Sequence, residues 1–292
     1  MNYKVTLLLF GEDYFGSLYN NYLLTRIIFR SIKNPFLLIL RRLHLNLKLP
    51  LFSLWYTSIK NMNSDAFLLF DTIYTPITTS YLRKKYPSSR IIVFFRNHIN
   101  DENILYKFDS TVEIWSYDLN DCKKYNIRYN TQFYFKEIAD LNYKESLLYD
   151  VFFVGKEKGR MHELKEIQKG LEDQGLKCFF YIIGNTVKER RKMLPYTEVI
   201  RLILHSKCIL DLLPEEQHGM SLRPLEALFF KKKLITNYIG IKDSNFYDRR
   251  NILLLESISD IYEAKNFMKL DYVYQNKESF YSFKEWLGRF FV

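Results

Sequence analysis

The sequence has few cysteines, few glycines and no long apolar run, and each shortage excludes a class of protein. Its 292 residues include only 3 cysteines, whose number and spacing fit neither a disulfide framework nor a metal site. The 10 glycines form no low-complexity segment, and no repeat of solenoid length occurs. No apolar run reaches the roughly 18–20 residues needed to span a bilayer. With 48% hydrophobic residues, we expect a globular cytoplasmic protein that begins with a strand rather than a signal peptide.

Acidic residues are absent from residues 14–64, although the chain as a whole contains 33 Asp and Glu against 43 Lys and Arg. The formal net charge is +10, and seven basic residues fall in this window. An AT-rich codon pool would enrich Lys throughout the chain, but it does not explain so local an asymmetry. The window therefore calls for an explanation of its own.

Residues 21–33 repeat with the period of a helix. Arg26, Arg30 and Lys33 would share one face, with apolar side chains opposite. This cationic face suits an anionic membrane surface and would make the protein peripheral on the inner face of the cell membrane. Alternatively, the apolar side simply packs on the core and the cations face water. Nucleic acid is a rival partner for such a patch, but no nucleic-acid module occurs, so we expect none to bind.

Short apolar runs alternate with helical patterns along the rest of the chain. Strands are predicted at residues 3–10, 66–70, 91–95, 112–115, 151–154, 178–183, 208–212 and 234–236. Helices are predicted between them at residues 76–85, 119–125, 163–174, 196–205 and 222–230, while residues 43–49 alternate with period two. This alternation predicts an α/β fold of two mostly parallel, doubly wound sheets. We place one domain at residues 1–140, a second at 141–276, and a last helix at 277–292 that returns to the first domain.

A turn with three cations follows the first strand of the second half. Gly155 and Gly159 bound it, and Lys156, Lys158 and Arg160 supply the charge. Such a turn can offer N–H groups and positive charge to a phosphate, although the turn taken alone is better explained as a solvated, charged loop. No Walker or dinucleotide-binding glycine pattern is present.

A second polar stretch follows the strand at residues 208–212. Gly219 and Ser221 would lie at a helix N-terminus, which favours an anion, and Arg223 could add a charge-assisted contact. Glu226, three residues further, is placed to accept hydrogen bonds from a pair of sugar hydroxyls. Ligands of open α/β sheets bind beyond the carboxyl ends of the strands, so we expect a binding site here.

The run "GMSLRPLEALFFKKKLITN", preceded by "YTEVIRLILHSKCILDLLPEE", resembles the donor-binding half of GT-B glycosyltransferases of the group 1 type. The resemblance covers about residues 150–252. It implies two Rossmann-like domains and transfer of a sugar from a nucleotide-diphosphate sugar to a glycan or lipid-linked glycan, in the synthesis of bacterial capsule, lipopolysaccharide or other surface polysaccharide. It further implies that Glu226 binds the ribose and that cations face the diphosphate. The expected donor-site residues are Gly155, Lys156, Lys158, Arg160, Tyr196, His218, Gly219, Met220, Ser221, Leu222, Arg223, Glu226 and Asn237.

The sequence departs from the family at one position. Retaining members carry a glutamate eight residues before the ribose-binding one, and here that residue is His218. Inverting transfer needs a base for the acceptor hydroxyl. His98 and Asp71, each just past a predicted strand, are the catalytic candidates, and a structural role explains either one equally.

No metal or cofactor is expected, because no Asp-x-Asp pair occurs and the histidines are dispersed. Two alternatives to sugar transfer stay open at this point. One is a nucleotide-sugar epimerase or phosphorylase on the same fold, and the other is a non-catalytic protein that binds membranes or nucleic acid.

Overall fold

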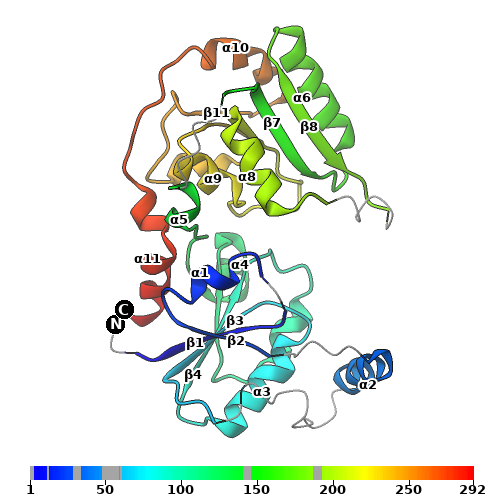
Figure 1. Cartoon of the computed structure of the whole chain (residues 1–292), viewed down its shortest axis with the longest axis vertical. Coiled ribbons are helices and arrows are strands. Elements are labelled where there is room, and N and C mark those ends of the chain that lie inside the picture. Colours follow the sequence, from blue (N-terminus) through cyan, green and yellow to red (C-terminus); the bar gives the residue numbers. More distant parts are fainter. Residues whose placement is uncertain are drawn as a thin grey trace. The chain divides into compact units, whose positions relative to one another are not determined.

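The computed structural model describes residues 3–11, 13–28, 34–47, 59, 61–140, 146–186 and 193–292. They form two compact units, Met1–Asn130 and Thr131–Val292 (Figure 1). The division falls ten residues before the boundary predicted from the sequence. In the described part of the chain, no helix has the length and apolar character needed to cross a membrane.

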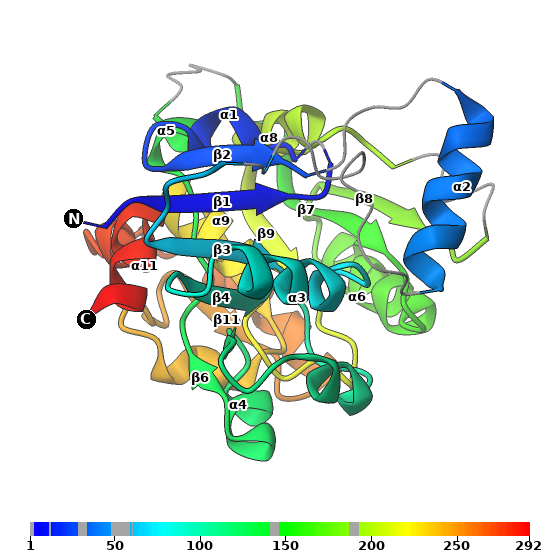
Figure 2. The same cartoon turned by 90° about the horizontal axis from the view of Figure 1, so that it is seen from below.

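The first unit is built on a parallel sheet with the strand order β2-β1-β3-β4-β5-β6, which Figure 2 shows most clearly. The strands are β1 (Val5–Leu9), β2 (Leu24–Ile27), β3 (Ala66–Phe70), β4 (Arg90–Phe95), β5 (Glu113–Ser116) and β6 (Arg128–Tyr129). The helical segments are α1 (Gly16–Tyr19), α2 (Pro35–Asn46), α3 (Thr75–Lys85), η2 (Glu102–Lys107) and α4 (Leu119–Tyr125). Strands β1, β3 and β4 are buried on both faces, which is why they consist of nearly uninterrupted apolar residues.

The second unit has a parallel sheet with the order β11-β10-β9-β7-β8. Its strands are β7 (Tyr149–Lys156), β8 (Cys178–Ile183), β9 (Ser206–Asp211), β10 (Lys233–Thr236) and β11 (Ile252–Leu254). The helical segments are α5 (Lys136–Ala139), α6 (Met161–Asp173), α8 (Tyr196–Leu204), α9 (Arg223–Phe229), η3 (Ile239–Asp243), η4 (Ile258–Glu263), α10 (Ala264–Phe267), η5 (Glu278–Tyr281), α11 (Phe283–Gly288) and η6 (Arg289–Phe291). From β7 the chain runs outward to β8, then returns to β9 and continues to β11. The two directions meet between β7 and β9, which is where such folds bind ligands.

One prediction for the N-terminal window was wrong. Residues 24–27 form the strand β2, not part of a helix, and β2 pairs in parallel with β1, Thr6 opposite Leu24. Residues 35–46 form the helix α2, which includes the first residues of the stretch that alternates with period two. The local reason for α2 is Asn34, whose side chain accepts a hydrogen bond from Phe36 N at 2.9 Å, ahead of Pro35 in the first turn.

The C-terminal segment packs on the residues that begin the second unit. The backbone of Tyr134 pairs with the chain around residue 282, accepting from Phe283 N at 3.1 Å. Phe133 lies 4.3 Å from Trp286 between ring centroids, and Phe135 stacks on Phe283 at 5.0 Å. The long helix predicted at residues 277–292 is instead the three short segments η5, α11 and η6. Residues 131–139 and 277–292 thus form one aromatic block of the second unit.

Candidate functional site

A pocket of about 360 Å³ opens in the second unit where β7 and β9 end. This volume lies in the range of small-molecule sites, about 300–1,000 Å³. Nine of the thirteen expected donor-site residues line it: Gly155, Lys156, Lys158, Arg160, Tyr196, Ser221, Leu222, Arg223 and Glu226. The strand order explains why these residues lie close together, because the segments that follow β7 and β9 meet where the strand order reverses.

Glu226 is the most deeply placed of these residues. It lies in the first turn of α9 and is only 2% exposed. Its Oε1 accepts a hydrogen bond from the Tyr196 hydroxyl at 2.5 Å, whereas its Oε2 has no hydrogen-bond partner among the described residues and lies 4.0 Å from Arg223 Nη1. Burial raises the pKa of this carboxyl above its ordinary value. A buried acceptor without a donor is costly, so the pocket holds one oxygen that a ligand hydroxyl can satisfy.

Tyr196 connects Glu226 to the aromatic block. Its hydroxyl lies 2.9 Å from the hydroxyl of Tyr134, which is held by the backbone pairing with the C-terminal segment. Burial, followed by the nearby Glu226 carboxylate, raises the pKa of Tyr196 well above its ordinary value. The tyrosine therefore stays protonated and remains a donor to Glu226 at any physiological pH. Tyr134 is a site residue that the sequence did not predict, because 62 residues separate it from Tyr196.

Four cationic side chains line the same pocket. Three belong to the turn after β7, where Lys158 has a φ of +45° and Gly159 one of +80°, a left-handed turn that leads into α6. Arg160 donates to the carbonyl of Lys156 at 2.9 Å. Burial, and then the neighbouring cations, lower the pKa of Lys158. A ligand with negative charge would relieve this crowding of like charges, so the arrangement favours an anion.

Arg223 supplies the fourth cation, and its position is fixed by β7. The guanidinium donates to the carbonyl of Val154 and lies 5.3 Å from the centre of the Phe153 ring. Gly155 makes room for it, because a Cβ at this position would meet Arg223 Nη2 at 3.0 Å and the Phe153 ring at 3.2 Å. Gly155, near the end of β7, therefore allows the arginine to pack closely against the strand.

Asp211, at the end of β9, lines the pocket and was missed from the sequence. Its carboxyl accepts from Ser221 Oγ at 2.8 Å and from Thr236 Oγ1 at 3.2 Å. Burial raises its pKa, and Arg223 opposes the rise. Ser221 Oγ also accepts from the backbone N of Arg223 at 3.1 Å. Asp211 thus anchors the loop that leads into α9.

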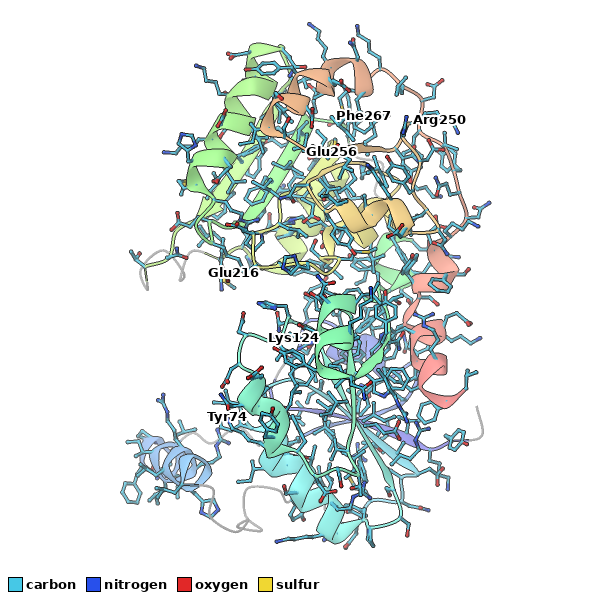
Figure 3. The ribbon with its side chains drawn as sticks, turned by 180° about the vertical axis from the view of Figure 1, so that it is seen from behind. Tyr74, Lys124, Glu216, Arg250, Glu256 and Phe267 are labelled. Carbon is cyan, nitrogen blue, oxygen red and sulfur yellow. The ribbon has the colours of Figure 1, made fainter. Side chains whose placement is uncertain are left out.

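Four expected donor-site residues do not line the pocket: His218, Gly219, Met220 and Asn237. The side chain of Asn237 pairs instead with the backbone of Leu213, accepting from its N at 2.6 Å and donating to its O at 3.0 Å. His218 is exposed on the loop after β9, close in sequence to Glu216, which Figure 3 labels. Helix α9 begins only at Arg223 and has seven residues. Its dipole is correspondingly small, so the attraction for an anion rests on the cations.

The two catalytic candidates lie in the first unit, past the carboxyl ends of β3 and β4. Both carboxyl oxygens of Asp71 are used, by Arg96 N at 2.6 Å and by Asn97 Nδ2 at 3.3 Å, and burial raises its pKa. His98 Nε2 is buried and has no hydrogen-bond partner in the described chain. Asp71 is therefore engaged in holding the turn after β4, whereas His98 has a buried ring nitrogen without a hydrogen-bond partner among the described residues.

Arg26, the first residue of the predicted membrane face, is exposed on β2, where its side chain donates to the carbonyl of Thr25 at 3.3 Å. Arg30 and Lys33 lie outside the described residues. The helix that was to carry all three therefore does not exist over residues 24–27, since β2 occupies them.

The described residues contain no cluster of three or more His, Cys, Asp or Glu side chains that could hold a metal ion. The three cysteines are free; Cys122 and Cys208 are buried and Cys178 is partly buried. Burial raises the pKa of Cys122 to about 11, so at neutral pH it stays a protonated thiol rather than a nucleophile.

The fold is similar to that of solved glycosyltransferases. The apo form of the lipopolysaccharide outer core galactosyltransferase WaaB matches over 98% of this chain and 97% of its own, with a TM-score of 0.54 and 13% identity. AviGT4, a glycosyltransferase involved in avilamycin A biosynthesis, matches over 99% and 96%, with a TM-score of 0.49 and 9% identity. No protein-family model and no curated protein matches the chain. The predicted fold class, two Rossmann-like domains of the GT-B type, is confirmed.

Proposed function

We propose that this protein is a glycosyltransferase that binds a nucleotide-diphosphate sugar in the pocket of the second unit and transfers the sugar to a glycan or lipid-linked glycan. The observation that carries the proposal is the open Oε2 of the buried Glu226 beside four cationic side chains. A hydroxyl donor and a multiply charged anion must occur in one ligand to satisfy both features. A ribose joined to a diphosphate has this composition.

The ribose would occupy the Glu226 end of the pocket. A carboxylate is an acceptor with several lone pairs, so it can receive hydrogen bonds from the two neighbouring ribose hydroxyls. The Tyr196 hydroxyl donates to Oε1, which leaves the unpartnered Oε2 for the ribose. Part of the lining is apolar and suits the flat face of a nucleobase. It consists of Val199, Leu212, Leu213 and Pro214.

The diphosphate would lie against Arg223 and the turn of Lys156, Lys158 and Arg160. Negative charge develops on the leaving diphosphate as the bond from its oxygen to the anomeric carbon breaks. Fixed cations in a partly buried site stabilise that charge without the solvent reorganisation that water would require. On this account the cations do the work for which other enzymes use a metal ion, so we expect transfer without added metal.

His98 is our candidate for the base. A base must take the proton of the acceptor hydroxyl as its oxygen attacks the anomeric carbon and the electrons of the broken bond go to the diphosphate, and we assign that proton to His98. Asp71 would support the reaction only indirectly, because its oxygens hold Arg96 N and Asn97. Since WaaB is described as a lipopolysaccharide outer core galactosyltransferase, we propose a bacterial surface polysaccharide as the product and the cytoplasmic face of the membrane as the location.

A calorimetric titration with UDP, GDP, ADP and TDP tests the proposal. One of them should bind the wild type, and Arg223→Gln should weaken that binding about tenfold or more through loss of a charge-assisted contact. Arg201→Gln is the matched control, because Arg201 is an exposed arginine of α8 that pairs with Glu198 and does not line the pocket. The corresponding sugar nucleotide should then be consumed only when an acceptor glycan is present.

Two results would contradict this function. A wild type that binds none of the four diphosphates would remove the donor site. Consumption of the sugar nucleotide without any acceptor, with an epimerised or phosphorolysed product, would support the rival enzyme classes instead.

A further inference from the structure

Helix α2 carries an apolar stripe that faces away from the protein. Its members are spaced at intervals of one helical turn, which places them within an arc of about 100°. We define the outer stripe as Phe36, Ile39, Leu40, Leu43 and Leu47, the last just beyond the helix end. These side chains are between 40% and 67% exposed. Helices of globular proteins normally turn such a stripe to the core, whereas α2 turns its stripe to the solvent.

The partly buried residues of α2 lie outside the stripe: Leu37, Arg41 and His44. Leu38 and Arg42, also outside it, are exposed. Figures 1 and 2 both draw α2 at the margin of the first unit, apart from its sheet. The helix is nevertheless well defined locally, because Asn34 caps it and Leu47 N donates to Leu43 O at 2.9 Å. The exposed stripe thus belongs to a capped, hydrogen-bonded helix.

The surrounding charge indicates what covers the stripe. No Asp or Glu occurs in residues 14–64, and α2 itself contains two adjacent arginines, Arg41 and Arg42. A partner protein would need both a complementary groove and acidic side chains around it, whereas an anionic membrane offers apolar depth and negative headgroups without shape complementarity. Long arginine side chains can reach headgroup phosphates while the apolar side chains insert.

We propose that α2 docks the protein on a membrane containing anionic lipid, with the outer stripe inserted at the boundary between headgroups and acyl chains. This surface replaces the one predicted at Arg26, Arg30 and Lys33. Vesicle binding is measured without sugar nucleotide or acceptor glycan. A failure to bind vesicles can therefore be distinguished from a failure of the proposed sugar transfer.

The test uses the full chain in vesicle sedimentation, with vesicles of phosphatidylcholine alone or mixed with phosphatidylglycerol. Wild type should bind the mixed vesicles more strongly. Ile39→Gln/Leu43→Gln should weaken binding to both about tenfold or more, because the apolar contact with the acyl chains is lost. The matched control is Ile239→Gln/Leu270→Gln, which removes two similarly exposed aliphatic side chains from the second unit and should bind as wild type does.

A second pair of substitutions separates charge from insertion. Arg41→Gln/Arg42→Gln should reduce the preference for phosphatidylglycerol and the sensitivity to salt, while binding to phosphatidylcholine changes little. Glutamine favours helix at all four positions of α2, and unchanged circular dichroism and melting verify that each variant folds.

Three outcomes would overturn the proposal. The wild type could fail to bind either kind of vesicle. The Ile39→Gln/Leu43→Gln variant could bind as well as its control. Finally, that variant could convert a wild-type dimer into a monomer without any change in vesicle binding, which would assign the outer stripe to a second copy of the chain.

Discussion

The hydrogen bond from Tyr196 to Glu226 should determine the pH range over which the nucleotide binds. Only the ionised carboxylate can accept from both ribose hydroxyls while it also accepts from Tyr196. Burial raises the Glu226 pKa, and the Tyr196 hydroxyl opposes the rise. Removing this donor by Tyr196→Phe should therefore raise the pKa of Glu226 further.

The sign of the effect follows from the protonation state. Binding falls as pH drops through the Glu226 pKa, because the protonated carboxyl loses acceptor capacity. A higher pKa in Tyr196→Phe moves this fall to higher pH. At a pH well above the fall, binding should still weaken, because the Glu226 carboxylate is no longer oriented by the Tyr196 hydroxyl.

The assay is calorimetric titration of the nucleoside diphosphate that binds wild type, repeated at several pH values. Tyr181→Phe is a control on β8, since Tyr181 is absent from the pocket lining, and it should leave the profile unchanged. A merely structural role of Tyr196 would lower the melting temperature and scale binding equally at every pH. Tyr196→Phe with wild-type affinity and an unshifted acid limb would refute the reasoning.

Three further predictions concern neighbouring residues. Gly155→Ala should displace the Arg223 guanidinium, since the added Cβ would lie 3.0 Å from Nη2, and diphosphate binding should weaken several-fold. Gly11→Ala should leave binding unchanged, because a Cβ there would have no atom within 4 Å. Calorimetric titration of both variants checks this. His98→Gln should lower turnover about 10²–10⁴-fold while calorimetry shows unchanged donor binding, and near-wild-type turnover would exclude it as the base. Asp71→Asn should lower stability by about 1–3 kcal/mol, because an amide cannot accept both hydrogen bonds from the turn after β4, and a melting curve equal to wild type would contradict that role.

The sequence predicted the central strands and their helices because burial on both faces leaves a continuous apolar run. The expected ranges of β3, β8 and α4 agree with the structure residue for residue. Strand β2 was missed because it is an exposed edge strand, on which no buried face imposes a period of two. Its pairing with β1 joins residues far apart in sequence, Thr6 and Leu24, and no local pattern encodes that contact.

Part of the candidate site could be predicted from the sequence, because residues that follow neighbouring parallel strands meet where the strand order reverses. That rule led to Glu226, Arg223 and the turn after β7. It could not distinguish Asn237, whose amide pairs with the backbone of Leu213, from a residue that faces the ligand. It also missed Asp211, because a single carboxylate at the end of an apolar run resembles an ordinary strand terminus.

The measurement that tests the central claim most directly compares a ribonucleoside diphosphate with its 2′-deoxy analogue on wild type and on Glu226→Ala. If Glu226 receives the ribose hydroxyls, wild type should bind the ribo form about tenfold or more tightly, the value of one hydrogen bond to a charged group, and Glu226→Ala should bind both forms with equal, weaker affinity. Equal binding of the two forms by wild type, or a preference for ribose that survives in Glu226→Ala, would contradict the account.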